Sequence, residues 1–323
     1  MRKCLYCYET LEVENNGDYH FQCNKDFYNS AIAPTLPYRL EDMTALAKQS
    51  VELSITVPGV QPKLSLGWIK SVIEDGHDGR LTIMDALDGN YILKPQNFDY
   101  KQMPENEHLS MKLAELFKID VVPSNMIRLA SGELCYITKR IDRPNFNSKI
   151  HMIDFLQILE LEDKYKGSME LVGKTVGELS VNTLLDKLRF FEMAVFNFII
   201  GNNDMHLKNF SMFLSKEGWV LSPAYDLLNV KIILPQDDDD TALFLGGKKK
   251  NFNKTYFDKY GKALGLNEKQ INYVYKKLAK WLPKAIELIN MSFLSDEKKT
   301  EYIELITKRT NLFLPIITSK SKF

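Results

Sequence analysis

The chain has 323 residues, 45% of them apolar, and its 42 basic and 42 acidic side chains give a formal net charge of zero. This balance does not favour a protein that binds nucleic acid or a membrane surface through charge alone. We find no transmembrane run and no signal peptide, and four cysteines do not make a disulfide framework. We therefore expect a cytoplasmic protein of one or two domains, with no membrane and no direct nucleic-acid partner.

The first residues contain a possible metal site. Cys4 and Cys7 form a C-x-x-C pair, and His20 and Cys23 form an H-x-x-C pair 12 residues later. Three sulfurs and one imidazole suit a structural, tetrahedral zinc ion. The alternatives are scattered cysteines in a disordered tail and a redox pair, although no βαβ pattern supports the latter. We expect one structural Zn²⁺ in a zinc-knuckle-like element over residues 1–32.

Residues 33–143 predict a β-rich lobe that carries one long helix. In chain order we expect a linker and a short helix at 40–49, strand-turn-strand at 53–69, a hairpin at 80–96 turning at 88–90, an amphipathic helix at 106–119, and two strands within 121–144.

Residues 144–323 predict a helical lobe. We expect helices at 150–162, 175–201, 267–291 and 295–313, and a hairpin-like stretch at 211–228. The acidic run at 237–240 and the basic run at 248–250 are typical of a solvated loop. A β-rich lobe followed by a helical lobe is an α+β, two-lobed layout.

A polar stretch, GNNDMHLKN at 201–209, interrupts two apolar segments. Buried polar groups must pair with one another or hold a ligand. Asp204 and Asn209 have the separation of the catalytic aspartate and the metal-binding asparagine of protein kinases. Asp226 follows a predicted strand, WVLS, where a second metal carboxylate would lie. These oxygen ligands suit Mg²⁺.

Other residues could complete such a site. Lys208 could neutralise charge on the transferred phosphoryl group, and His206 of the same loop is a further catalytic candidate. Lys94 stands alone in an apolar strand, where a nucleotide phosphate would compensate its charge and Glu107 could orient it. A turn that includes Gly59 and Val60 lies between two predicted strands, where a phosphate-covering loop would be.

Each of these residues has a structural alternative. The Asn and Asp residues at 202–204 could end one helix and cap the next turn. Lys94 could extend to solvent, and Asp226 could cap a helix that begins at Leu227. The order of lysine, glutamate, Asp-x4-Asn and aspartate across two lobes favours the catalytic interpretation over these separate ones.

The sequence resembles the HipA-like kinases of bacterial toxin–antitoxin modules over roughly residues 50–315. The matching stretches are VPGVQPKLSL, YILKPQ, NEHLSMKLAE, CYITKRIDR, IIGNNDMHLKNFSMF, LSPAYDLL and LPQDDDDTALFLGGKKK. The resemblance implies a two-lobed protein-kinase-like fold, and Mg-ATP-dependent serine or threonine phosphorylation of an aminoacyl-tRNA synthetase.

The resemblance also implies roles for individual residues. Asp204 would be the catalytic base, Asn209 and Asp226 the Mg²⁺ ligands, and Lys94 a phosphate contact. The backbone from Lys139 to Ile141 would form the adenine-binding hinge. The family autophosphorylates a serine before the glycine-loop turn; the matching position here is Thr56, and Ser54 is the other candidate.

The part of the chain before the kinase core is shorter than in full-length HipA toxins, which have a β-rich subdomain there. In this the chain resembles the short form, HipT. The resemblance implies two partners, a small HipS-like antitoxin that replaces the missing subdomain and a helix-turn-helix HipB-like protein. The cysteine cluster lies outside the resemblance.

Overall fold

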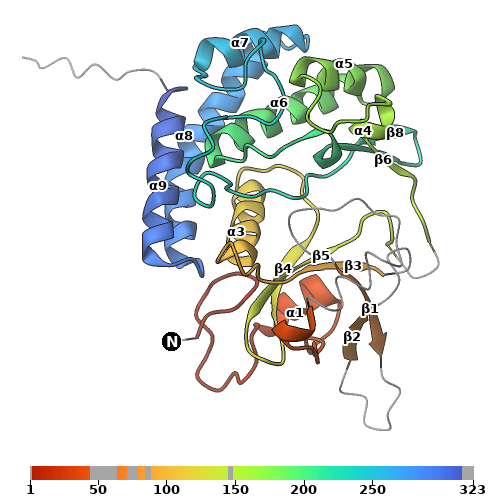
Figure 1. The fold of residues 1–323 in the computed structure, drawn as a ribbon, viewed down its shortest axis with the longest axis vertical. Helices are drawn as coiled ribbons and strands as arrows, with labels where there is room; N and C mark the ends of the chain where they lie inside the picture. Colours follow the sequence, from red (N-terminus) through yellow and green to blue (C-terminus); the bar gives the residue numbers. More distant parts are fainter. Residues whose placement is uncertain (1, 44–63, 71–78, 84–88, 145–147, 315–323) are drawn as a thin grey trace, which may run out of the picture. The chain divides into compact units, whose positions relative to one another are not determined.

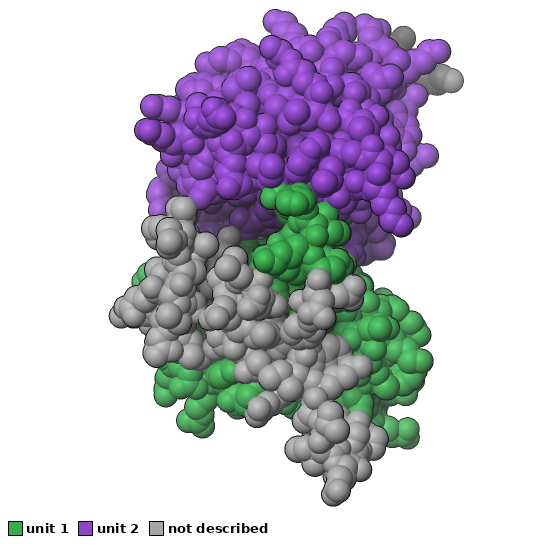
Figure 2. Space-filling model, turned by 90° about the vertical axis from the view of Figure 1, so that its right-hand side faces the viewer, with its two compact units in different colours: residues 1–112, 121–152, 291–294 green, residues 113–120, 153–290, 295–323 purple. Residues whose placement is uncertain are grey.

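The computed structural model describes residues 2–43, 64–70, 79–83, 89–144 and 148–314. The chain divides into two compact units, coloured green and purple in Figure 2. Unit 1 is Met1–Lys112, Val121–Met152 and Met291–Leu294, and unit 2 is Leu113–Asp120, Ile153–Asn290 and Ser295–Phe323. None of the described helices is long and apolar enough to cross a membrane.

Unit 1 contains an antiparallel five-stranded sheet of order β2-β1-β3-β5-β4 (Figure 1). Its strands are β1 Leu64–Lys70, β2 Gly79–Ile83, β3 Tyr91–Lys94, β4 Ser124–Arg128 and β5 Leu134–Lys139. The predicted pairing of β4 with β5 is confirmed. The predicted hairpin at 80–96 is wrong, because β1 lies between β2 and β3 and pairs with both.

Two helices, α1 and the part of α3 that belongs to unit 1, cover opposite faces of this sheet. Helix α1 (Phe21–Tyr28), which the sequence did not predict, places Phe27 with its ring centroid 6.0 Å from that of Tyr91 in β3. Helix α3 (Met103–Leu116) places Glu107 against Lys94, at the other end of the same strand. Successive side chains of a strand point to alternate faces, so Tyr91 and Lys94 lie on different faces.

The helices of unit 2 are α4 Phe155–Ile158, α5 Met169–Leu179, α6 Thr183–Ile200, α7 Lys254–Ala263, α8 Glu268–Met291 and α9 Asp296–Asn311. Helix α6 is the core element: α5 and α9 both contact it, and its Phe190, Phe191 and Phe196 are fully buried. The single helix expected at 175–201 is two helices, because Ser180 takes an extended conformation that ends α5. Helix α7 was not predicted.

Unit 2 contains a three-stranded sheet of order β6-β7-β8, and the polar loop at 201–209 lies between helix α6 and strand β7. Its strands are β6 Met152–Asp154, β7 Ser211–Leu214 and β8 Trp219–Leu221, and the predicted hairpin of β7 with β8 is confirmed. The fully buried carboxylate of Asp186 in α6 accepts hydrogen bonds from the Ser180 hydroxyl at 2.5 Å and the Leu221 amide at 2.8 Å. This carboxylate ties α6 to β8.

We predict that Asp186→Ala lowers the free energy of unfolding by about 2 kcal/mol, because it leaves a buried amide and a buried hydroxyl without an acceptor. Urea denaturation followed by circular dichroism measures the change. The control is Asp238→Asn, since the Asp238 side chain is 84% exposed and its removal should leave stability unchanged. Equal stability of Asp186→Ala and the wild type would contradict the tie.

Candidate active site

The polar loop begins where α6 ends. Gly201 adopts a left-handed conformation with φ 77°, and the Asn202 amide donates to the Asn197 carbonyl at 2.9 Å. The Asn202 side chain also donates to the Asn197 side chain at 2.9 Å. The alternative in which this stretch merely ends a helix therefore accounts for Gly201 and Asn202. It does not account for Asp204, which lies beyond these bonds.

Asp204 is half-buried and meets a residue that sequence reasoning missed. The hydroxyl of Tyr165, in the loop between α4 and α5, donates to Asp204 Oδ1 at 2.9 Å. Burial and the neighbouring Asp204 charge hold the pKa of Tyr165 well above its usual value, so the phenol remains a proton donor. The backbone supports this contact, because the Leu207 amide donates to the Lys164 carbonyl at 3.1 Å.

Asn209 and Asp226, 17 positions apart, are brought together. Asn209 Nδ2 donates to Asp226 Oδ2 at 3.1 Å. Tyr225 supports the approach, since its hydroxyl donates to the Lys208 carbonyl at 3.0 Å and contacts the Ser211 hydroxyl at 2.5 Å. Asp226 itself has φ 60°, a left-handed conformation that few residues other than glycine adopt. Such strain is concentrated at functional sites.

The alternative in which Asp226 caps a helix is wrong, since no helix begins at Leu227. The acidic run is also more than a solvated loop. The Asn203 side chain donates to Asp237 Oδ2 at 2.8 Å and to the Asp239 carbonyl at 2.9 Å. This part of the run thus holds the residue next to Asp204. Asp240, at the end of the run, pairs with the buried Arg309.

His206 and Lys208 lie in the same loop with different surroundings. His206 is buried, and its Nε2 lies 2.9 Å from Lys164 Nζ. A lysine ammonium can only donate, so Nε2 accepts this bond. The pairing favours a role for His206 in holding the loop over a role in proton transfer. Lys208 is half-buried, and its backbone is fixed by Tyr225.

In unit 1, Lys94 and Glu107 form a buried ion pair. Lys94 Nζ lies 2.5 Å from Glu107 Oε1, and the two side chains are only 5% and 2% exposed. The alternative in which Lys94 extends to solvent is therefore wrong. The ammonium also lies 5.4 Å from the centroid of the Tyr136 ring. Such a buried pair is weak evidence for stability, because desolvation offsets much of the attraction.

The hinge candidates lie at the end of β5. The Lys139 amide donates to the Pro123 carbonyl at 3.0 Å, and the Arg140 amide donates to the Asn90 carbonyl at 2.8 Å. These bonds occupy the backbone donors of Lys139 and Arg140, and the adenine-binding role of the segment from Lys139 to Ile141 remains a prediction. The candidates Gly59, Val60, Thr56 and Ser54 lie outside the described residues.

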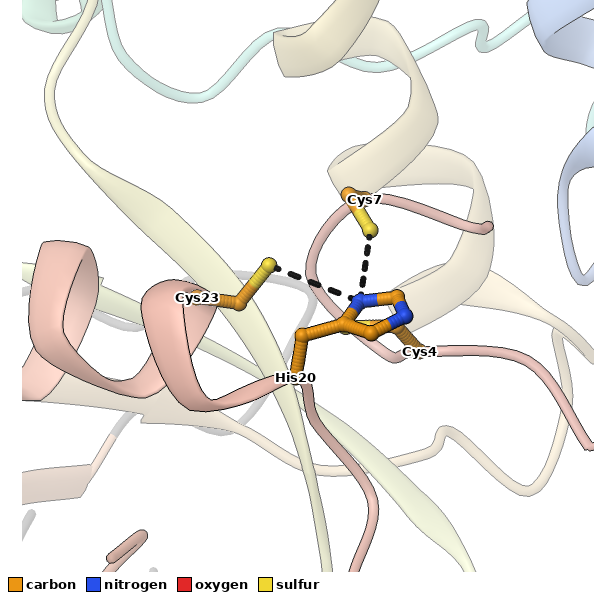
Figure 3. Close-up of side chains that lie close together, drawn as sticks. All are labelled: Cys4, Cys7, His20 and Cys23. Atoms are coloured by element: carbon orange, nitrogen blue, oxygen red, sulfur yellow. Dashed lines mark hydrogen bonds between the residues drawn. The ribbon is translucent and has the colours of Figure 1, made fainter. Parts of the chain in front are cut away.

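The cysteine cluster is brought together in unit 1, as Figure 3 shows. The ligand atoms of Cys4, Cys7, His20 and Cys23 all lie within 4.8 Å of one another. Tetrahedral zinc bound by thiolates needs sulfurs about 3.8 Å apart, so the donors fit with a small contraction. A hydrogen bond between the Cys4 and Cys7 thiols holds the pKa of Cys4 below its usual value and that of Cys7 above it, and burial raises the pKa of Cys23, so Cys4 is the first of the three to become a thiolate.

The sequence profile described as the HipA-like C-terminal domain matches residues 55–286, more than half of the chain. The chain belongs to the HipA-like family. This HipA-like chain is 25% identical over 312 residues to a putative kinase of Haemophilus influenzae, covering 87% of the chain and 86% of that relative. It is 27% identical over 199 residues to the serine/threonine-protein kinase toxin HipA of Shewanella oneidensis, covering 54% of the chain and 43% of that HipA.

Among solved structures, the HipA-like chain is similar to the Shewanella oneidensis HipA that was determined with HipB and its operator DNA. The TM-score is 0.65 at 19% identity, covering 85% of the chain and 70% of that HipA. At this identity the likeness shows the fold alone. The predicted α+β, kinase-like fold is confirmed.

Proposed function

We propose that this HipA-like chain is a Mg-ATP-dependent serine/threonine protein kinase and the toxin of a HipBST-type toxin–antitoxin module. The observation that carries the proposal is the approach of Asn209 to Asp226 at 3.1 Å, in the loop that also holds Asp204. These three residues supply the base and two oxygen ligands that kinase chemistry needs. The kinase names of its curated relatives support the same reading.

In the proposed reaction, Asp204 accepts the proton of a serine or threonine hydroxyl as the oxygen bonds to the γ-phosphorus of ATP. The bond from that phosphorus to the bridging oxygen breaks, and ADP leaves with the electron pair. Asn209 Oδ1 and a carboxylate oxygen of Asp226 would hold Mg²⁺, which neutralises charge on the phosphates when bound. The Asn209 amide would then present its oxygen where it now presents nitrogen.

The lysines of the proposed site act on the phosphates. Lys94 would contact them through its ammonium, while Glu107 keeps that ammonium in position. Lys208 would stabilise negative charge as the phosphoryl group is transferred. The proposal therefore predicts that variants of Lys94 and variants of Lys208 each lose phosphate transfer.

Tyr165 is proposed as a positioning residue for Asp204. We predict that Tyr165→Phe lowers kcat about tenfold and leaves KM for ATP unchanged, because the carboxylate loses the bond that orients it. The control is Tyr273→Phe, since Tyr273 is exposed.

A different result would reassign Tyr165. If Tyr165→Phe raises phosphate transfer by lowering KM for the protein acceptor, the phenol competes with the acceptor for Asp204. Such a gain would contradict the positioning role.

The proposed substrate is an aminoacyl-tRNA synthetase in the cytoplasm, as the family resemblance implies. Phosphoproteomics after induced expression tests this, with an Asp204→Asn strain as the reference. The expected result is a new phosphoserine or phosphothreonine on a synthetase in the wild-type strain alone. A new phosphorylated lipid or metabolite, with no new phosphoprotein, would favour a small-molecule kinase.

The proposal includes control of the kinase by modification and by partners. Autophosphorylation is proposed at Thr56 or Ser54, where it would add up to about two negative charges beside the phosphate-covering turn. A small HipS-like antitoxin and a helix-turn-helix HipB-like protein are the proposed partners. The structure of the Shewanella HipA with HipB and operator DNA supports a partner of the second kind.

The proposal also assigns one structural Zn²⁺ to the cysteine cluster. Its four protein donors would fill a tetrahedral shell and leave no open position for water or substrate. Such an ion supplies folding energy to a small element and takes no part in phosphate transfer.

A further inference from the structure

We propose that the metal bound by the cysteine cluster clamps helix α3 and strand β3 together, and thereby sets Glu107 against Lys94. The clamp rests on the proposed kinase function only for its effect on nucleotide binding. Its structural part stands on contacts within unit 1, between the element at 2–28 and the two elements that carry the ion pair.

The first observation is the strained conformation of Tyr8, which directly follows the ligand Cys7. Tyr8 has φ 69°, in the left-handed region that bulky residues rarely enter. The turn is tight: the Tyr8 amide donates to the Cys4 carbonyl at 3.0 Å, and the Cys4 amide donates to the Glu9 carbonyl at 2.8 Å. Strain of this kind persists only where the surroundings enforce it. Bonds from one ion to Cys4 and Cys7 would close this turn.

The second observation is what the strained conformation achieves. It directs the buried Tyr8 side chain onto α3, where its hydroxyl lies 2.8 Å from Nδ1 of the fully buried His108. Burial holds the pKa of His108 well below its usual value, so its neutral ring nitrogen can accept a hydrogen bond from the Tyr8 hydroxyl. The two rings also meet edge to face with centroids 5.3 Å apart.

The loop that contains Cys7 makes a second contact with α3, four residues after His108. Lys112 Nζ lies 4.1 Å from the centroid of the Tyr6 ring. Residues four apart lie on one face of a helix, so the turn that contains Cys7 contacts His108 and Lys112 on a common face. Glu107 precedes His108 and therefore points about 100° away around the helix, toward the sheet. Fixing this face of α3 fixes the direction of Glu107.

The helix that begins at the H-x-x-C half of the cluster contacts the strand that carries Lys94. Helix α1 begins directly after His20 and includes Cys23. On this helix, Phe27 contacts Tyr91 of β3 with ring centroids 6.0 Å apart. The Phe27 ring also lies 5.2 Å from Lys139 Nζ of β5. One ion bound by both halves of the cluster would therefore link the contacts to α3 with the contacts to β3.

The proposal predicts that breaking one hydroxyl contact weakens nucleotide binding while the metal stays bound. Tyr8→Phe keeps the ring and removes the hydroxyl. We expect one zinc per chain in both proteins by elemental analysis. Calorimetry with Mg²⁺ and a nonhydrolysable ATP analogue should show about tenfold weaker binding for Tyr8→Phe. Removal of zinc by a chelator should weaken binding of the wild type at least as much.

The exchange rates of backbone amide hydrogens test the clamp in the absence of nucleotide. Tyr8→Phe and zinc removal should each speed exchange of the amides of α3 up to Lys112, and leave those of α8 unchanged. Tyr273→Phe is the control, and should alter neither measurement. Faster exchange throughout both units would show general unfolding and overturn the clamp.

Two further outcomes separate this proposal from the proposed function. Purified chain without zinc, or zinc-bound Tyr8→Phe with wild-type exchange in α3, would overturn the clamp whatever the chain catalyses. Wild-type chain that binds no nucleotide would instead overturn the proposed function. The expected exchange result in α3 would still support the clamp in that case.

Discussion

Asp204→Asn is expected to abolish measurable phosphate transfer while Mg-ATP binding stays at the wild-type level. A positioned general base contributes about 10²–10⁴-fold to the rate, and an amide cannot take up the hydroxyl proton. Asparagine retains an oxygen that can accept the Tyr165 hydroxyl bond, so the loop should keep its geometry. Asp204→Asn therefore differs from the wild type in the charge and basicity of a single side chain.

Intact-mass spectrometry after incubation with Mg-ATP measures this result, with calorimetry to confirm binding. The wild type should gain phosphate, mapped to Thr56 or Ser54, and Asp204→Asn should gain none. Asp238→Asn is the matched control because it removes an exposed carboxylate from the same unit. Full-rate incorporation by Asp204→Asn would show that another group is the base.

Lys94→Met is the second substitution for which we expect a large effect, and it should lower both the stability of the chain and its phosphate transfer. The substitution leaves Glu107 buried without its ammonium partner, which typically costs about 3–5 kcal/mol. It also removes the proposed phosphate contact, so phosphate transfer should be lost. Two measurements, urea denaturation and phosphate incorporation, follow the two effects separately.

The double variant Lys94→Met with Glu107→Gln separates structure from chemistry. A neutral amide is cheaper to bury than a carboxylate, so much of the lost stability should return. Phosphate transfer should remain absent, because the Lys94 ammonium that is proposed to contact the phosphates is still missing. If activity returns with stability, Lys94 is a structural residue only.

The control for this series is Lys277→Met. Lys277 forms a comparable pair with Glu192 at 2.8 Å, with side chains 15% and 10% exposed, inside unit 2. Its loss should lower stability and leave the specific activity of the folded protein unchanged. A loss of specific activity equal to that of Lys94→Met would show that any disrupted ion pair impairs the chain.

The proximity of Asn209 and Asp226 could be predicted because its signal is local. Asp204 and Asn209 are separated by a short fixed spacing, and Asp226 follows a short hairpin, so chain order alone suggested their proximity. Their catalytic roles remain predictions. Tyr165 carried no comparable signal, because it reaches Asp204 only through a loop 39 positions earlier. A lone tyrosine in a loop sequence does not indicate such a contact.

The fold shows the same division between local and distant information. The β4–β5 pair is joined by a short turn, and its pairing was predicted. Strands β2 and β3 were wrongly predicted to form a hairpin, because the periodicity of apolar residues does not determine the order of strands in a sheet. The interpretation of the acidic run as a solvated loop was incomplete for a similar reason. Its charges are typical of a solvated loop, and only the folded chain shows Asn203 and Arg309 as partners for Asp237 and Asp240.

The left-handed conformation of Asp226 affects the choice of an inactive variant for work on partners. Alanine at this position would remove the carboxylate and also place an unsuited residue at φ 60°, which disfavours the folded loop by about 1–2 kcal/mol. A weakened antitoxin complex of Asp226→Ala could therefore reflect a displaced loop. Asparagine tolerates this backbone, so Asp226→Asn is the better inactive form for crystallising and measuring complexes.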